Sequence, residues 1–559
     1  MVHDYLVMLK KYQRRLWADK YILLTIIIGS IVWSLTMVKS GLFYDFGFGY
    51  WGPNGHDGIW HISLASSLLE RGFSMPIFAG ATVSNYHIGF DLLLAILSKV
   101  STIPISVLYF QILPPLFAVT IGLLAALLLR KLSWNSVAIS WSLFFVYFGG
   151  NLGWLVTYIR DGHIGGASMF WAQPAVLTLV NPPFALSLII LLVALIALQS
   201  RKLILSALLI GILIQVKAYA AVIVLVSLIC VSIYYYLTQK KLFFAKVTVL
   251  ATIVSVMLFL PFNSGSSSLF VFKPFWFLET MMQFPDRVGW ARFGEAMVNY
   301  KLAGNLVKGA LAYLIAFFIF WYGNVGTRLV AEIYSIKLLN KKREWFDIFV
   351  ISSIVIGLTI PMFFVQKGTA WNTIQFFYYS LFFISLISGY VIEKIIVYLK
   401  PKQKLVFVVL LIVLTIPTTI DVLKHYLPKT PPAMISKQEY AALGYLANQP
   451  EGIILIPPFD RSLGQYDPAP RPLYVYESTS YVSAFTGKQV FLEDEVNLDI
   501  TGFNWQDRKS DIEEFFINPD KEFLVTHNIS YIYIPRKYGI TLDLVKLFEN
   551  NEITIYSSN

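Results

Sequence analysis

Charged residues are scarce in this chain of 559 residues. They make up 14% of it, against roughly 25% in ordinary soluble domains, while hydrophobic residues make up 57%. A soluble fold is therefore excluded. Cysteine is almost absent as well: Cys230 is the one cysteine and lies in an apolar stretch, which excludes an intramolecular disulfide and a cysteine-based metal site.

Several familiar signals are also missing. The first residues have no short apolar core with a small-residue cleavage site, so we expect no removable signal peptide. No Walker loop occurs, and no G-x-G-x-x-G follows a strand pattern, so nucleotide use has no support. The net charge of +11 would suggest nucleic acid in a soluble protein, but here the positive-inside rule accounts for it. We expect no nucleic-acid partner.

What the chain does contain is a series of apolar blocks between Tyr21 and Ile420, most of them long enough to cross a hydrocarbon layer of about 30 Å. Their pattern predicts an α-helical polytopic membrane protein with about eleven transmembrane helices, over a membrane domain of residues 1–420. The blocks lie near residues 21–40, 105–129, 135–158, 176–199, 203–217, 219–237, 244–262, 307–330, 346–365, 372–397 and 403–420.

Orientation follows from the cations. Lys10, Lys11, Arg14, Arg15 and Lys20 precede the first block, which predicts a cytoplasmic N-terminus. With eleven crossings, the basic clusters of the later loops also fall on the cytoplasmic side. The odd number of crossings then places the C-terminus outside the cell.

The first outer loop, residues 41–104, is expected to hold two short interfacial helices, near 58–71 and 88–101. The second stretch could be counted as a further crossing, but it contains Asp91 and Lys99 and spans only about 20 Å as a helix. Counting it would also move a basic cluster to the outside. We therefore interpret it as lying on the outer surface.

From about residue 421 to 559 the composition becomes that of a soluble domain. β-type runs begin at Ile453, Leu473 and Ile529, and Ser436 and Glu439 have the spacing of a helix capping box. These signals predict an extracytoplasmic α/β domain that folds separately from the membrane part.

Three of the seven histidines lie in the first outer loop together with several acidic residues. Such a concentration at the membrane surface is a candidate functional site. For Asp57 two interpretations stay open. It precedes the first interfacial helix, where aspartate is a favoured N-cap, or it is a catalytic carboxylate.

Two short segments resemble the GT-C superfamily of membrane glycosyltransferases: GHDGIWH, residues 55–61, and NYH, residues 85–87. The segment YVSAFTGKQVFLEDEV, from Tyr481, is similar to that group as well. The resemblance implies that Asp57 is the catalytic acidic residue and that His87 stands where protein mannosyltransferases have the histidine of a His-Pro-Pro motif. By the same resemblance, His56, His61 and Tyr86 are expected to bind substrate.

The sequence departs from the family in three ways. His56 and Asp57 replace an Asp-Glu pair, no prolines follow His87, and no Trp-Trp-Asp motif occurs. Protein glycosylation is therefore not supported.

The implied function is transfer of a sugar from a polyprenyl-phosphate-linked donor to a glycan, lipid or protein acceptor at the outer face of the plasma membrane. This reaction needs a carboxylate to accept a proton and cations to stabilise the leaving phosphate, and it needs no metal or cofactor on this interpretation. Asp57 supplies the carboxylate. The candidate cations are Lys217, Lys367, Arg287 and Arg292, whose alternative role is contact with lipid head groups.

Two other functions remain open: a flippase or transporter of lipid-linked glycans, and a catalytically inactive relative. A carrier should have polar residues through the middle of the membrane. Here the spanning blocks are largely apolar, and polar residues gather at their outer ends. The pattern favours the enzyme.

The orientation can be tested with reporter fusions. A reporter that is active only outside the cytoplasm should be active when it is joined after Tyr426. In this orientation the basic clusters share the inner face of the membrane. A reporter at this position that is found in the cytoplasm would contradict both the predicted orientation and the prediction that the site lies at the outer face.

Overall fold

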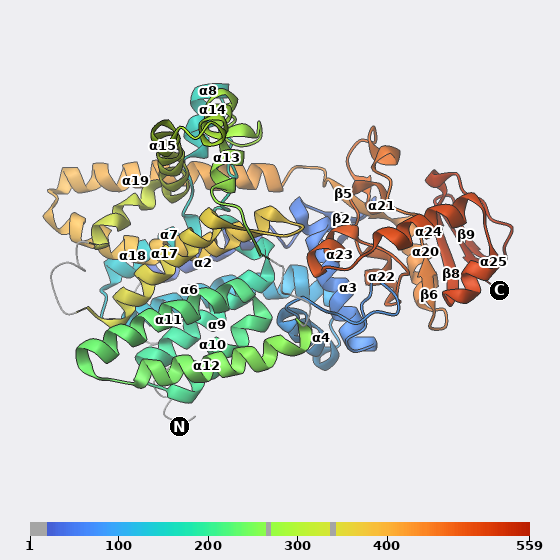
Figure 1. Cartoon of the computed structure of the whole chain (residues 1–559), viewed down its shortest axis with the longest axis horizontal. Coiled ribbons are helices and arrows are strands. Elements are labelled where there is room, and N and C mark those ends of the chain that lie inside the picture. The colour runs from blue at the N-terminus through green and yellow to red at the C-terminus, as the bar shows by residue number, and fades with distance from the viewer. Residues whose placement is uncertain (1–19, 264–269, 336–342, 559) are drawn as a thin grey trace. The chain divides into compact units, whose positions relative to one another are not determined.

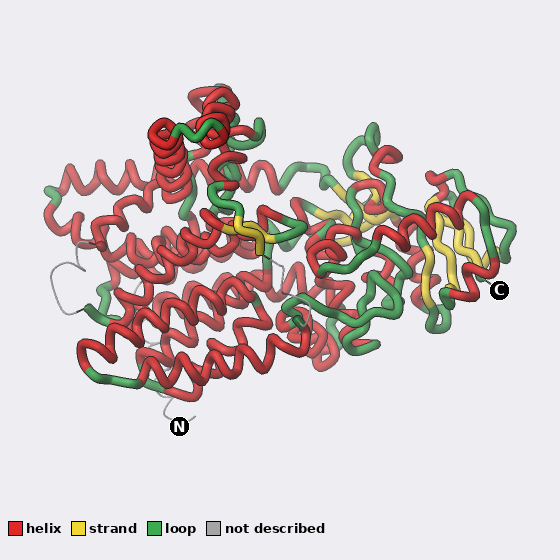
Figure 2. The backbone as a smooth tube through the Cα atoms, in the orientation of Figure 1, coloured by secondary structure: helices red, strands yellow, loops and turns green. Residues whose placement is uncertain are grey.

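The computed structural model describes residues 20–263, 270–335 and 343–558. These residues are mostly helical and form two compact units (Figure 1 and Figure 2). The first unit takes its described residues from Met1–Ser34, Pro115–Pro261 and Ser267–Lys424, and the second from Leu35–Pro114, Phe262–Ser266 and His425–Asn559. The cations before Lys20, on which the predicted orientation depends, lie outside the described residues.

The first unit is built from apolar helices, several of which lie side by side in Figure 1. Each predicted apolar block is helical over most of its described length. The helices are α2 (Lys20–Ser34), α6 (Leu113–Lys131), α7 (Ser136–Phe148), α8 (Gly153–Asp161), α9 (Pro182–Gln199), α10 (Leu203–Val216), α11 (Ala218–Gln239), α12 (Phe243–Phe259), α15 (Leu306–Val325), α17 (Trp345–Phe363), α18 (Gln375–Tyr398) and α19 (Pro401–Tyr426). Most of these helices have apolar residues around most of their circumference, as is typical of helices that face lipid or a protein core.

Eight helical stretches in the described part are long and apolar enough to span a membrane. There are nine if α7 and α8, which meet at a bend of 53°, form one span. The apolar helices α2 and α10 are shorter, with 15 and 14 residues. The chain is thus an integral membrane protein, and the count of eleven crossings stays a prediction.

Both expected helices of the first outer loop are present, as α3 (Asp57–Glu70) and α4 (Gly89–Ser101). Helix α3 is buried over most of its surface, so it is a core element of the second unit. Helix α4 buries one face and exposes Leu92, Ile96 and Val100 on another. This exposed apolar face agrees with the predicted interfacial position of α4, which itself remains untested.

Two sheets organise the second unit. The first has the order β1-β2-β5-β7 and the second the order β6-β8-β10-β9. Antiparallel pairs join β1 to β2, β2 to β5, β8 to β10 and β10 to β9, whereas β5 and β7, and β6 and β8, are parallel. The strands are β1 (Leu42–Tyr44), β2 (Gly47–Tyr50), β5 (Ala433–Ser436), β6 (Ile453–Leu455), β7 (Arg471–Pro472), β8 (Ile529–Pro535), β9 (Lys546–Glu549) and β10 (Ile553–Ser557).

The first sheet and the core combine the outer loop with the C-terminal segment. Strand β2 of the loop pairs with β5, where Phe48 faces Ile435. The core packs Trp60 and Leu64 of α3 in one cluster with Leu455 and Ile532 of the second sheet. The predicted division at residue 421 separates these partners. In the structure they belong to one unit, because strand β2 and core side chains of the loop pack with the C-terminal segment.

The predicted α/β pattern of the C-terminal segment is confirmed with one correction. The runs at Ile453 and Ile529 are strands β6 and β8, and the Ser436 side chain accepts a hydrogen bond from the Glu439 backbone N–H at the start of α20 (Lys437–Ala447). The prediction of a strand for the run LYVY is wrong, since these residues form the short helix α21 (Leu473–Tyr476). Four residues that alternate in burial fit one helical turn as well as a strand.

The shared core predicts how fragments behave. Residues 421–559 expressed alone should show no cooperative thermal transition, because β5 loses its partner and the core loses the side chains of α3. A chain that joins Leu35–Pro114 to His425–Asn559 through a flexible linker should melt cooperatively in detergent. Circular dichroism against temperature measures both. A sharp transition in the C-terminal fragment alone would show that the loop is dispensable.

Candidate active site

Asp57 begins helix α3, but it does not occupy the N-cap position. His56 is the N-cap residue, and its side chain makes no capping hydrogen bond. The capping interpretation of Asp57 is therefore wrong. Its carboxylate lies at the first helical position, where the N-terminal end of the helix dipole favours a negative charge. The Asp57 side chain is 54% exposed, so a substrate can reach it.

His56 is buried between two carboxylates. Its Nδ1–H donates to Asp57 Oδ1 at 2.9 Å, and its Nε2 lies 3.5 Å from Asp494 Oδ1. Burial opposes a charge on the imidazole, but the carboxylates of Asp494 and Asp57 outweigh it and hold the pKa of His56 well above 6.5. The charged His56 imidazole thus lies between two carboxyl groups, the buried one of Asp494 and the exposed one of Asp57.

Asp494 itself is held rigidly. Its side chain is fully buried, and it caps α23 (Glu495–Thr501) by accepting hydrogen bonds from the backbone N–H and the side-chain amide of Asn497. Its backbone has a φ of +55°, a conformation that is rare for a residue with a side chain. Such strain is commonly found at functional sites, and here it aims the carboxylate at His56.

A buried polar network fixes α3 against the C-terminal segment. Glu493 accepts hydrogen bonds from the backbone N–H groups of Val482 and Ser483 and from the Ser483 hydroxyl. The Ser483 Oγ lies 2.7 Å from the Oγ of Ser63 on α3. Burial raises the pKa of Glu493 to about 8, while these hydrogen bonds favour its charged form. The network positions α3, and with it Asp57, on helix α22 (Tyr481–Thr486).

His61 points into the same unit from the next turn of α3. Its Nδ1–H donates to Asp91 Oδ1 on α4 at 2.6 Å, and both side chains are buried. The imidazole also stacks on Tyr109, with ring centroids 5.7 Å apart. In this geometry His61 holds α3 against α4, and a contact with substrate stays a prediction.

Tyr86 and His87 lie side by side before α4, with ring centroids 4.7 Å apart. The Tyr86 ring also meets Trp60 of α3 edge to face at 5.5 Å. The preceding Asn85 has a φ of +54° and donates from its side chain to the Thr501 carbonyl at the end of α23. The NYH segment is thus packed against both α3 and α23.

The four predicted cations belong to the first unit, and the structure brings two of their segments together. Lys217 lies at the break between α10 and α11, is 5% exposed, and places Nζ 3.4 Å from Asn181 Oδ1. Lys367 is exposed, directly after strand β4 (Phe364–Gln366), which pairs with β3 (Phe270–Phe272). The Tyr219 hydroxyl donates to Gln366 Oε1 at 2.8 Å, so the two segments are neighbours.

Arg287 and Arg292 differ from each other. The Arg287 guanidinium lies 4.0 Å from the ring centre of Trp171 and donates to the Ser168 carbonyl at 2.7 Å. It therefore ties the loop before α9 to the segment between α13 (Trp276–Gln283) and α14 (Ala291–Leu302). Arg292 is exposed on α14.

Sequence reasoning missed Asp494. The run of acidic residues at 493–495 before a helix was a usable signal, but its partner His56 lies far away along the chain. As for metals, no three His, Cys, Asp or Glu side chains in the described ranges are arranged to hold an ion.

The sequence matches no protein-family model and none of the curated protein sequences compared with it. The fold, in contrast, is similar to that of the oligosaccharyltransferase of Archaeoglobus fulgidus. One structure of that enzyme, tethered to an acceptor peptide with the NVT sequon, has a TM-score of 0.52 and 13% identity, covering 93% of this chain and 70% of that one. Another, of AglB with an inhibitory peptide and a dolichol-phosphate, has a TM-score of 0.51 and 12% identity, covering 95% and 70%.

ArnT from Cupriavidus metallidurans superposes with a TM-score of 0.44 and 10% identity, over 97% of this chain and 98% of that one. The fold assignment rests on the archaeal enzyme. This chain has the GT-C fold, as its sequence predicts.

The charge on His56 gives a prediction for stability. Because its pKa is raised in the folded state, its ion pairs contribute stability that is fully present below about pH 6.5 and is lost as the pH rises through the raised pKa. His56→Gln should therefore lower the melting temperature most at pH 6, and the difference from the unmodified protein should shrink towards alkaline pH. His163→Gln, at an exposed position, is the control. A difference that is constant from pH 6 to alkaline pH would contradict a charged His56.

Proposed function

We propose that this protein is a glycosyltransferase that moves a sugar from a polyprenyl-phosphate-linked donor to an acceptor at the outer face of the plasma membrane. Its N-terminus would be cytoplasmic and its C-terminus extracytoplasmic. The observation that carries the proposal is the half-exposed carboxylate of Asp57, held by a buried His56 and Asp494 in a chain with the GT-C fold.

In the proposed reaction the hydroxyl oxygen of the acceptor attacks the anomeric carbon of the donor sugar. The Asp57 carboxylate accepts the proton of that hydroxyl. The bond from that carbon to the phosphate oxygen breaks, and the phosphate leaves on the lipid. His56 orients Asp57 through the hydrogen bond that its Nδ1–H donates to Asp57 Oδ1 at 2.9 Å. Asp494 keeps His56 charged and in place.

The leaving phosphate needs positive charge, and we assign this role to Lys217, Lys367, Arg287 and Arg292. The proximity of the Lys217 and Lys367 segments supports a shared role for these two lysines. The archaeal enzyme with a similar fold binds a dolichol-phosphate. This supports a lipid phosphate as part of the donor here. His61, Tyr86 and His87 would then contact the sugar or shape the site around it.

The function predicts the effect of Asp57→Asn. The change removes the basic group while keeping the size of the side chain, so the transfer rate should fall by roughly 10²- to 10⁴-fold. Transfer of labelled sugar from a panel of polyprenyl-phosphate sugars, measured in detergent, gives the rate. Asp45→Asn, on the exposed turn between β1 and β2, is the matched control and should be near normal.

A folded Asp57→Asn protein with a near-normal rate would reject Asp57 as the base. If Asp45→Asn were then inactive, the base would be Asp45. If the protein moved a lipid-linked glycan across the membrane, and neither change affected this movement, a carrier would be the better assignment.

A further inference from the structure

A hollow lined by two arginines lies in the second unit. One wall is the short 3-10 helix η7 (Arg461–Gly464) with the residue after it, and the other is the segment from β7 to α21. The hollow contains about 780 Å³ free of protein atoms, open solvent included, and the centres of water-sized molecules have about 430 Å³ available. It therefore has room for a small organic ligand. The lining residues, none of which has a part in the proposed function, are Arg461, Ser462, Gln465, Arg471, Val475 and Tyr476.

The polar side chains that line the hollow can all donate hydrogen bonds. They are two guanidinium groups, two hydroxyls and one carboxamide, and no carboxylate is among them. Arginine stays protonated in proteins, so the lining carries two positive charges. The nearby carboxylate of Asp467 makes an ion pair with Lys537. The lining thus suits an anion.

Both guanidinium groups keep donors for a ligand. Arg471 is half-buried, and its Nε–H donates to the Asp467 carbonyl at 2.9 Å, which fixes the direction of the side chain. Its two Nη atoms donate to no described residue, and neither of them is buried. Arg461 is exposed, and its side chain has no hydrogen bond or ion pair with the described residues. Arg471 therefore offers a fixed pair of donors, and Arg461 offers a second group that can adapt to the ligand.

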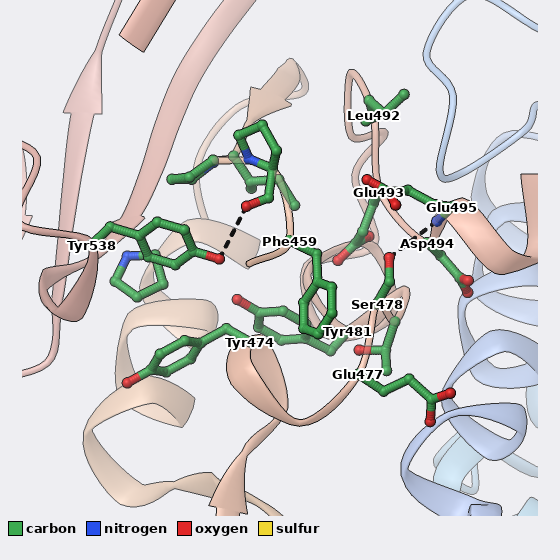
Figure 3. Close-up of a pocket in the computed structure, with 15 residues that line it drawn as sticks. Phe459, Tyr474, Glu477, Ser478, Tyr481, Leu492, Glu493, Asp494, Glu495 and Tyr538 are labelled. Carbon is green, nitrogen blue, oxygen red and sulfur yellow. Dashed lines mark hydrogen bonds between the residues drawn. The ribbon is translucent and has the colours of Figure 1, made fainter. Parts of the chain in front are cut away.

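The neighbouring pocket beside Asp494 has the opposite character (Figure 3). Tyr474 and Glu477 line that pocket, whereas Val475 and Tyr476 line the hollow. Four carboxylates and no lysine or arginine line the pocket, and it leaves only about 30 Å³ for the centres of water-sized molecules. Charge and size both disfavour an anionic ligand there. Of the two, only the hollow can take one.

The hollow is built on the sheet that supports the turn before Asp57. Strand β7 pairs with β5 through Arg471 and Ala433. Gly55 packs against β5 and α21, because a Cβ atom on it would lie 3.2 Å from the Ala433 Cβ and 3.5 Å from the Leu473 Cδ2. The strand pair that positions Arg471 thus also positions the residues that lead into α3.

We propose that this hollow binds a phosphate monoester, with Arg461 and Arg471 as its anchors. At pH 7 such a group carries a charge of about −1.5 to −2 and has three acceptor oxygens, so two guanidinium groups match it in charge and in hydrogen bonds. A carboxylate, with one charge, would leave one arginine without a partner. The site goes beyond the proposed function, in which cations of the first unit hold the leaving phosphate.

The test is binding of glycerol 3-phosphate to the full-length protein in dodecyl maltoside, measured by isothermal titration calorimetry at low salt. Arg461→Gln and Arg471→Gln should each weaken the binding by about tenfold or more, because each removes charge-assisted hydrogen bonds. Arg536→Gln is the matched control at an exposed position of the same unit and should leave the binding unchanged. Glycerol, which lacks the phosphate, should not bind.

A second ligand distinguishes a soluble ester from a lipid head group. Dihexanoyl phosphatidic acid carries the same phosphate monoester on a short-chain lipid. If it binds more tightly than glycerol 3-phosphate, and both arginine variants weaken this binding, the hollow takes a lipid head group. If it binds equally or more weakly, with the same effect of the variants, the hollow takes a soluble ester.

No binding of either ligand would overturn the proposal, and so would equal binding by the unmodified protein and Arg461→Gln. Lys217→Gln should keep the binding. If Lys217→Gln lost it and the arginine variants did not, the phosphate would be bound by the first unit and the hollow would be rejected. Melting temperatures identify a misfolded variant. Arg461→Gln removes no contact within the described residues, so it keeps the proposal testable if Arg471→Gln unfolds.

Discussion

The candidate site depends on one buried positive charge. An imidazolium taken out of water is costly unless carboxylates surround it, and His56 has Asp57 on one nitrogen and Asp494 near the other. Each carboxylate in turn has its own support: the start of α3 for Asp57, and the Asn497 hydrogen bonds for Asp494. Because the side chains of His56, Asp57 and Asp494 compensate one another electrostatically, the positions of α3 and α23 are coupled. A displacement of one helix should therefore displace the other.

The same coupling explains the construction of the second unit. Pairing of β2 with β5, the Ser63 and Ser483 contact and the shared core all join the outer loop to the C-terminal segment. The loop contributes the exposed carboxylate, and the C-terminal segment contributes the rigid acid behind it. Neither part contains the whole series, so the site is a property of the assembled unit.

Local patterns in the sequence predicted much of this fold. Apolar blocks indicated the helices of the first unit, the Ser436 cap located the start of α20, and the pattern of residues 58–71 located α3. The run at Leu473 failed because four residues cannot distinguish a strand from one helical turn. The pairing of His56 with Asp494 was out of reach for a different reason. It is a contact between distant segments, and no local periodicity encodes it.

The β2–β5 pairing has a consequence for biosynthesis. About 380 residues separate the two strands along the chain, and at roughly 5–20 residues per second a ribosome needs about 20 to 80 s to make them. During this time β2 has an unpaired edge and α3 lacks its packing partners. A nascent chain therefore inserts its helices before it can assemble its carboxylate series, and a truncated product would leave apolar loop surface open to chaperones or proteases.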